Sequence, residues 1–360
     1  MEYLYKRIAD SLEERISNGA YEEGAQLPTV RVLADEFETT ATTVGKALDQ
    51  LTDAGYIERR PKVGLFVRPR ALWRARAASG LGGVIAFDTS VSVFWGRAVD
   101  AMVKAFRERE LHLVLGHSDH RSDRALEYVE LLAAKGIEGF IYVPIEAEAP
   151  AHYVEMNARV LEAINRTGVP VVLFDRTVPG WNLPSVTLEN YNAGRRAAEF
   201  LLQSGSRAPL CVSVQYCDAV AERERGFCDA LAENGVPDAQ SRLLRFSKPV
   251  TRASSQENRE MLERIFRDLL EESNAPDGFF CVNSNVTNGL TAIIESTRRH
   301  DNLPVSGIRE LTLDHPECVG MIIEQPIQTY GYEAGRLLCD LIESRRNGEE
   351  TRRQSTPHVT

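Results

Sequence analysis

The chain has 360 residues, and at roughly 150 residues per domain this length predicts two or three domains, such as one small module and one large one. Hydrophobic residues make up 43% and charged residues 26%, which is typical of a globular protein with a sizeable core and excludes disordered, collagen-like and disulfide-scaffold classes. The net charge of −10 argues against a protein that coats nucleic acid over its whole surface.

The sequence also indicates a compartment. No apolar run reaches the about 18 residues that a membrane span needs, and residues 1–10 carry four charges where a signal peptide would be apolar. We therefore expect a cytoplasmic protein. No pair of cysteines has CxxC spacing, so free thiols are expected at all six. These are Cys211, Cys217, Cys228, Cys281, Cys318 and Cys339.

Residues 1–70 contain three apolar patterns with helical spacing. Their apolar positions are Leu4, Ile8, Leu12 and Ile16, then Val30, Leu33, Ala34 and Phe37, then Val44, Ala47, Leu48 and Leu51. Thr29 can cap the second helix with its hydroxyl. Because only residues 38–41 separate the second and third helices, we expect a helix-turn-helix. The third helix would then present polar side chains suited to a DNA groove, namely Thr42, Thr43, Lys46 and Gln50.

A basic segment follows these helices. Residues 59–76 contain seven basic residues and no acidic one. Residues 56–58 and 65–67 alternate like strands on either side of residues 59–64, which predicts a hairpin, or wing, with a basic tip. The same pattern is compatible with a three-helix module that carries a solvated charged loop.

Three motifs decide between these alternatives: LPTVRVLA at 27–34, TTVGKAL at 42–48 and GLFV at 64–67. Together with the residues around them, they resemble the winged helix-turn-helix of GntR-family transcription regulators. Two positions depart from the family pattern, because Ala41 and Gly45 stand where basic residues are common. The resemblance implies DNA contacts from Arg31, Thr43, Lys46, Lys62 and Gly64.

The remainder of the chain alternates between strand-like and helical patterns. Apolar runs at 84–87, 111–115, 139–143, 169–174, 210–214 and 278–282 alternate with helical stretches at 95–109, 123–135, 151–167, 190–204, 219–234, 256–272 and 286–299. Strands that are apolar on both faces and alternate with helices predict doubly wound parallel sheets. About 265 residues exceed one such sheet, so two lobes with a cleft between them are expected.

In open parallel sheets a ligand binds at the carboxyl ends of the strands. The polar residues found there are Asp88, Ser90, Ser92, His117, Asp175, Arg176, Tyr216 and Asn283. With Phe94 and Trp95 as apolar platforms, such groups suit a polyhydroxylated ligand. Any one of these residues taken alone is more often a helix cap or part of a surface pair.

Several longer segments are informative together, among them GVIAFDTSVSVFW at 83–95, GVPVVLFDRTVP at 168–179 and ERERGFCDALAENG at 222–235. Their order and spacing over residues 82–345 resemble the effector domain of LacI-family repressors, which is similar to periplasmic sugar-binding proteins of type I. The resemblance implies effector contacts from Asp88, Phe94, Asp175, Arg176, Asn190, Arg223 and Asn283.

The large module also departs from its family. Ser284 stands where the family has Asp, and residues 307–310 read GIRE where it has an acidic pair. Losing an acceptor for hydroxyl groups and gaining Arg309 disfavours a neutral sugar bound in the usual way. We expect either a negatively charged sugar acid or a ligand seated mainly on the first lobe.

Other site types find little support. His112, His117, His120 and Asp119 lie on a strand and its exit and would not share one face, so no metal site is expected. Neither a phosphate-binding loop nor a GxSxG elbow occurs in the sequence. After residue 135 the only lysine is Lys248, in a polar stretch, which argues against a pyridoxal phosphate enzyme. No cofactor is expected.

These inferences predict a DNA-binding domain at 1–70, a linker at 71–81, an effector and dimerisation domain at 82–345 and a polar tail at 346–360. The predicted function is a ligand-responsive transcriptional regulator of an arabinose-repressor-like subgroup, most simply a repressor. Its expected partners are double-stranded operator DNA, a sugar or sugar-acid effector and a second copy of the chain. The alternative is a sugar-processing enzyme with an accessory DNA-binding module.

Overall fold

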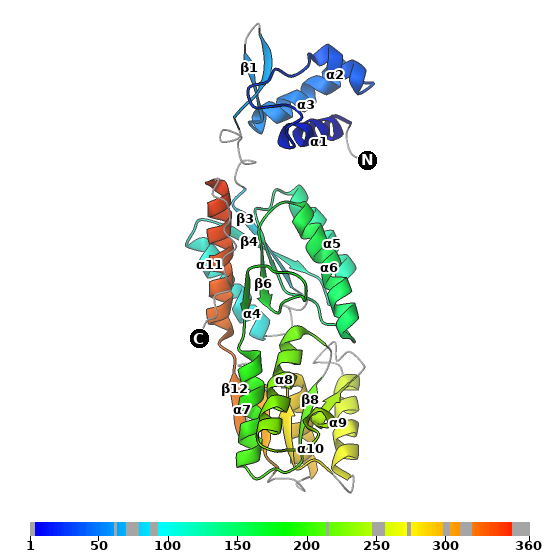
Figure 1. Ribbon diagram of the computed structural model, residues 1–360, viewed down its shortest axis with the longest axis vertical. Helices are drawn as coiled ribbons and strands as arrows, with labels where there is room; N and C mark the ends of the chain where they lie inside the picture. Colours follow the sequence, from blue (N-terminus) through cyan, green and yellow to red (C-terminus); the bar gives the residue numbers. More distant parts are fainter. Residues whose placement is uncertain are drawn as a thin grey trace. The chain divides into compact units, whose positions relative to one another are not determined.

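Three helices and a hairpin form the N-terminal unit in a computed structural model of the chain (Figure 1). The helices are α1 (Leu4–Ser17), α2 (Val30–Glu36) and α3 (Ala41–Asp53), and the antiparallel hairpin joins β1 (Ile57–Arg60) to β2 (Gly64–Val67). Thr29 and Thr40 cap α2 and α3, each accepting a hydrogen bond from a backbone N–H three residues on. This confirms the predicted winged helix-turn-helix.

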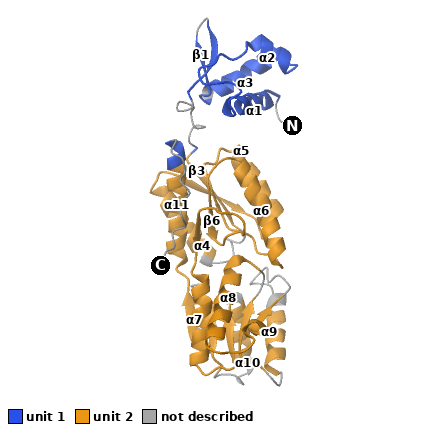
Figure 2. Ribbon diagram, in the orientation of Figure 1, with its two compact units in different colours: residues 1–79, 344–350 blue, residues 80–343, 351–360 orange. Residues whose placement is uncertain are grey.

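The structure describes residues 4–60, 63–69, 79–86, 93–213, 216–246, 256–271, 275–297, 303–309 and 319–347. Two compact units divide the chain, one of residues 1–79 with 344–350 and one of residues 80–343 with 351–360 (Figure 2). Most of the predicted linker lies outside the described residues, so the predicted domain boundaries stay predictions. In the parts of the chain that the structure covers, no helix is both long and apolar enough to cross a membrane.

The first lobe of the larger unit is a five-stranded parallel sheet in the order β4-β3-β5-β6-β7. Its strands are β3 (Leu81–Ala86), β4 (His112–His117), β5 (Phe140–Tyr142), β6 (Val171–Asp175) and β7 (Ser185–Thr187). Helices α4 (Val93–Arg107) and α11 (Ile327–Arg346) pack on one face, and α5 (Ser122–Ala134) and α6 (Pro150–Arg166) pack on the other.

The second lobe repeats this plan with the strand order β12-β11-β10-β8-β9. Its strands are β8 (Pro209–Ser213), β9 (Leu243–Arg245), β10 (Gly278–Cys281), β11 (Val305–Arg309) and β12 (Met321–Glu324). Helices α7 (Asn190–Gln203) and α8 (Asp218–Glu233) cover one face, and α9 (Gln256–Glu271) and α10 (Ser284–Thr297) cover the other. Two doubly wound parallel sheets, as predicted, therefore carry the strand ends that build the site.

Apolar spacing did not predict four strands and one helix of this unit. The helix is α11, the last helix that the structure describes. The strands are β7, β9, β11 and β12, which lie next to or at the sheet edges and have only three to five residues each. Runs this short give too few positions for an alternation to stand out. The five cysteines that the structure describes are buried, as expected for residues in apolar runs; Cys318 lies outside the described residues.

Candidate functional site

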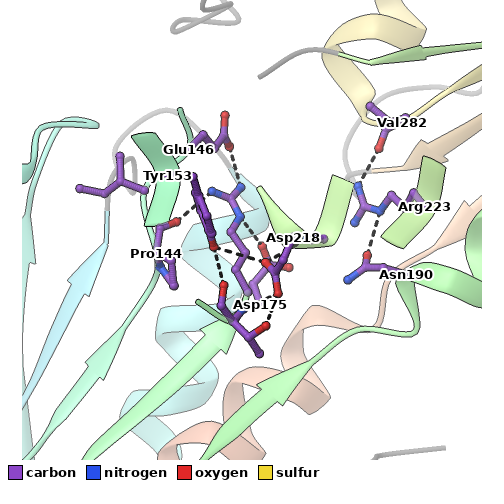
Figure 3. Close-up of polar contacts among 12 residues, drawn as sticks. Pro144, Glu146, Tyr153, Asp175, Asn190, Asp218, Arg223 and Val282 are labelled. Atoms are coloured by element: carbon purple, nitrogen blue, oxygen red, sulfur yellow. Dashed lines mark hydrogen bonds and ion pairs between the residues drawn. The ribbon is translucent and has the colours of Figure 1, made fainter. Parts of the chain in front are cut away.

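The first half of the candidate effector site is centred on Arg176, which follows β6 at the carboxyl end of the first sheet. Figure 3 labels the residues that surround it, Pro144, Glu146 and Asp175. Its guanidinium is buried and donates three hydrogen bonds. Nε donates to Oδ2 of Asp175 at 3.1 Å, Nη1 to the carbonyl of Pro144 at 3.0 Å and Nη2 to Oε1 of Glu146 at 2.6 Å. A planar donor thus joins the exits of two neighbouring strands, β5 and β6.

The backbone of Asp175 is left-handed, with φ of +67°. This conformation is uncommon for a residue other than glycine, and it concentrates at ligand-binding positions. In a regular strand the side chains of neighbouring residues point to opposite faces. The left-handed turn at Asp175 breaks that alternation, so its carboxylate meets the guanidinium of the next residue, Arg176.

The second half of the site is centred on Arg223 of α8, whose side chain is also buried. Nε donates to Oδ1 of Asn190 at 2.8 Å, and Nη1 donates to the carbonyl of Val282 at 2.6 Å. Burial lowers the pKa of Arg223, and attraction to the Asp175 carboxylate opposes this only in part. The lobe therefore holds a cation that its own hydrogen-bond partners do not neutralise.

The contact between Asn190 and Arg223 depends on two glycines, one on each of the packed helices α7 and α8. A Cβ atom on Gly194 would lie 1.9 Å from the carbonyl oxygen of Arg223, and one on Gly226 would lie 2.0 Å from the carbonyl oxygen of Tyr191. No side chain fits at such distances. The helices therefore cross closely at Arg223, which belongs to the polar pair, and at Tyr191, which is next to Asn190. This close crossing brings Asn190 within reach of Arg223.

The two lobes meet through Asp218, the first residue of α8. One carboxylate oxygen accepts hydrogen bonds from the backbone N–H of Thr177, at 2.6 Å, and from its hydroxyl; the other accepts from the hydroxyl of Tyr153 at 3.3 Å. Burial raises the pKa of Asp218, although the Thr177 donors counteract it. An antiparallel bridge between Ala147 and Tyr216 adds a second link.

The structure brings together some of the predicted effector residues. Asp175 and Arg176 form one group and Asn190 and Arg223 another, and Figure 3 shows the two groups as separate clusters. Oδ1 of Asn283 accepts from the N–H of Val286 at 3.0 Å, so this side chain caps α10. Asp88 and the side chain of Phe94 lie outside the described residues.

Trp95 does not serve as the expected apolar platform for a ligand. It is 7% exposed and packs edge-on against Phe174, with the ring centroids 6.0 Å apart. The α-helical period places it on the core face of α4, one residue after Phe94.

Sequence reasoning missed four polar residues of this region: Glu146, Tyr153, Thr177 and Asp218. Glu146 and Thr177 follow strands β5 and β6 by a few residues, so a wider search after each apolar run would have found them. Tyr153 and Asp218 lie in the first turns of helices α6 and α8, and their pairing across the lobes had no sequence signal.

In the N-terminal unit, the predicted DNA contacts differ in their surroundings. Arg31, Thr42 and Lys46 are exposed, and no hydrogen bond or ion pair within the described residues holds the two cations. The hydroxyl of Thr43 hydrogen-bonds that of Thr40 at 2.9 Å. By contrast, Arg59 pairs with Asp49, and Arg60 pairs with Glu58 and lies over the Phe66 ring.

Gly64 has a reason to be glycine within the chain itself. Its φ is +142°, and an added Cβ would lie 2.5 Å from Nε2 of Gln26, which donates to the carbonyl of Val63 at 2.8 Å. The predicted DNA contact at Gly64 stays a prediction. Lys62, the other predicted contact in the wing, lies outside the described residues.

Comparison with known proteins gives two family matches. The profile of bacterial regulatory proteins of the gntR family matches residues 4–67, and that of periplasmic binding proteins and the sugar binding domain of the LacI family matches residues 82–297. The chain is also 20% identical, over 351 residues, to the arabinose metabolism transcriptional repressor of Halalkalibacterium halodurans, covering 96% of this chain and 91% of that protein.

Two solved structures illustrate the shared fold. The transcription regulator CcpA of Lactococcus lactis matches with a TM-score of 0.64 at 16% identity, covering 78% of this chain and 95% of that one. A LacI family regulator from Enterococcus faecium with bound ribose matches with a TM-score of 0.56 at 20% identity, covering 73% and 90%. At these identities the likeness shows the fold alone.

Proposed function

Because the chain belongs to the family of periplasmic binding proteins and LacI-type sugar-binding domains and carries a GntR-type head, we propose that it is a transcriptional repressor controlled by a sugar or sugar-acid effector. The observation that carries this proposal is the pair of buried arginines at the carboxyl ends of the two sheets, Arg176 on one lobe and Arg223 on the other. Guanidinium groups held in place by hydrogen bonds suit the hydroxyl and carboxylate groups of such a ligand.

The head would bind operator DNA through α3 in the major groove. Thr42, Thr43 and Lys46 lie along this helix, and Arg31 projects from α2. The hairpin β1–β2 would place Lys62 and Gly64 against the phosphate backbone. Because Arg59 and Arg60 are paired with carboxylates, we assign a phosphate contact of the described head to Lys46 and a base-edge contact to Arg31.

The effector would act by changing the relative populations of two arrangements of the lobes. Asp88, Phe94, Asp175 and Arg176 would contact it from the first lobe, and Asn190, Arg223 and Asn283 from the second. A ligand shifts such an equilibrium only by its difference in affinity for the two states. The contact of Asp218 with Thr177 joins the lobes directly, so it is a contact whose strength helps to set that equilibrium.

We also propose that the regulator works as a homodimer, formed through the large unit. One winged head buries little DNA surface, and a two-fold protein matches a palindromic operator. Equilibrium sedimentation of the full chain tests this, and a monomer at operator-binding concentrations would contradict it.

The central experiment measures operator binding by the full chain, by fluorescence anisotropy, with and without candidate sugars and sugar acids. We expect at least one compound to change the operator affinity tenfold or more without being consumed. Turnover of the bound compound would favour the enzyme alternative. If none of the compounds that shift the melting temperature alters operator binding, effector control is wrong.

A further inference from the structure

The two arginines of the candidate site are compensated differently. Arg176 is hydrogen-bonded to two carboxylates, those of Asp175 and Glu146, whereas both acceptors of Arg223 are neutral groups of Asn190 and Val282. We propose that the effector carries a carboxylate and that Arg223 binds it, an inference that rests on the proposed effector function and narrows the ligand to sugar acids.

The charges around Arg223 support this assignment. The described carboxylates on the elements packed against it are already engaged: Glu224 with Arg245 and Ser213, Asp218 with Thr177 and Tyr153, Asp175 and Glu146 with Arg176, Glu222 with Arg225, Glu189 with Asn192, Asp229 with Tyr191, and Glu199 and Glu233 with Arg195. Of the carboxylates, Asp175 and then Glu146, both on the first lobe, raise the pKa of Arg223, and burial outweighs them. Among the residues that the structure describes, the second lobe therefore supplies no uncommitted carboxylate to Arg223.

The described ends of the strands next to β10 carry no further acidic residue. The residue after Asn283, where α10 begins, is Ser284, and strand β11, which pairs with β10, ends in Arg309. These two positions therefore add a hydroxyl and a cation, and no carboxylate, to this end of the sheet. This favours an effector that brings its own negative charge over one seated mainly on the first lobe.

Arg223 also has donors to spare. Its Nε and Nη1 atoms are committed to Asn190 and Val282, while Nη2 makes no hydrogen bond to any residue that the structure describes. A guanidinium held by two neutral acceptors is fixed in orientation but keeps its charge. A carboxylate that accepts from Nη2 would form a charge-assisted hydrogen bond in a desolvated setting, where such bonds are strongest.

The test compares each acid with a neutral compound of the same shape. Titration calorimetry of the full chain would use D-galacturonate against D-galacturonamide and D-glucuronate against D-glucuronamide, with D-galactose, D-glucose and L-arabinose as neutral sugars. We expect one uronate to bind about tenfold to hundredfold more tightly than its amide, because only the acid gains a charged partner. This comparison needs no variant, so it holds even if substitutions at Arg223 impair folding.

Variants then assign the effect to one side chain. Arg223→Gln should weaken the uronate by tenfold or more and the amide by much less, and Arg223→Lys should restore part of the difference. Arg225→Gln is the matched control, because it removes the same charge from the same helix at an exposed position paired with Glu222. It should leave both affinities unchanged.

The outcomes separate this inference from the proposed function. A neutral sugar or amide that binds as tightly as the acids, or an equal loss in Arg223→Gln and Arg225→Gln, overturns the inference, and the repressor proposal survives if that neutral compound releases the operator. If no uronate binds, the inference is also wrong. If no compound in the whole series binds or releases operator DNA, the proposal of sugar or sugar-acid control falls with it.

Discussion

The two units of the chain handle positive charge in opposite ways. In the head, Arg31 and Lys46 are exposed and make no ion pair among the described residues. In the effector unit, Arg176 and Arg223 are buried at the ends of strands and are fixed by hydrogen bonds. DNA is a large polyanion that meets a surface, so exposed cations serve it; a small ligand needs cations already stripped of water.

The largest effect is expected for Arg176→Ala, which tests whether a buried arginine of the effector unit belongs to the site. The substitution leaves Asp175 and Glu146 as close, uncompensated carboxylates, and breaking a buried pair in this way costs about 3–5 kcal/mol. We expect a large drop in the unfolding midpoint of the effector unit and no response of operator binding to ligand. Operator affinity itself should remain, since the head is untouched. Calorimetric unfolding and anisotropy measure the two effects, and an intact ligand response would mean that Arg176 does not belong to the site.

Gly226→Ala tests whether the packing of α7 on α8 positions Arg223. The new methyl group would overlap the carbonyl of Tyr191, and overpacking of this kind costs about 1–3 kcal/mol. We expect weaker effector binding with unchanged operator binding. Gly96→Ala is the control, because a Cβ at that helical position meets nothing within 4 Å. Equal losses of effector affinity in both variants would contradict a positioning role for this helix contact.

Arg31→Ala tests the role of the exposed cations of the head in binding operator DNA. If this exposed guanidinium reaches a base edge, its loss should cost about 1–3 kcal/mol of operator affinity and reduce the preference for operator over random DNA. Anisotropy with both duplexes measures this. A loss that is equal on the two duplexes would instead make Arg31 a phosphate contact.

Lys46→Ala should have a smaller effect at physiological salt. If Lys46 contacts one phosphate, binding should weaken about equally on all duplexes, and the slope of log affinity against log salt should become shallower by about 0.9. Arg59→Ala provides the comparison, because its partner Asp49 already reduces its attraction for phosphate. An unchanged salt slope in Lys46→Ala would remove this residue from the interface.

The smallest expected effect concerns acid stability at Asp277, away from both charge clusters. Burial alone would raise the pKa of Asp277, but hydrogen bonds from the Ser206 hydroxyl and from the N–H groups of Arg207 and Ala208 hold it below the usual value. A lowered pKa in the folded state adds stability above the unfolded pKa of about 4, and this contribution is lost as pH falls through the folded pKa. Asp277→Asn should therefore show a smaller decline in its urea midpoint between pH 5 and 3 than the unaltered chain.

Much of the fold could be predicted from the sequence, because its long helices and buried strands repeat apolar residues with a clear period. The caps at Thr29 and Thr40 are local, since each involves residues only three apart. Strands β7, β9, β11 and β12 were missed because runs of three to five residues give too few positions for an alternation to stand out. The strand-end rule found Asp175 and Arg176, but not Tyr153 or Asp218, because these two lie on helices of different lobes.

By itself the sequence determined the order of the modules, the type of each module and the residue types available at the strand ends, since these depend on local spacing and composition. Tertiary structure alone decided which of those residues meet and which charges remain uncompensated. The left-handed turn at Asp175 and the close crossing of α7 and α8 at Gly194 and Gly226 bring the site residues together. Burial gives a charge its strength, and burial is a property of the whole fold and not of any segment.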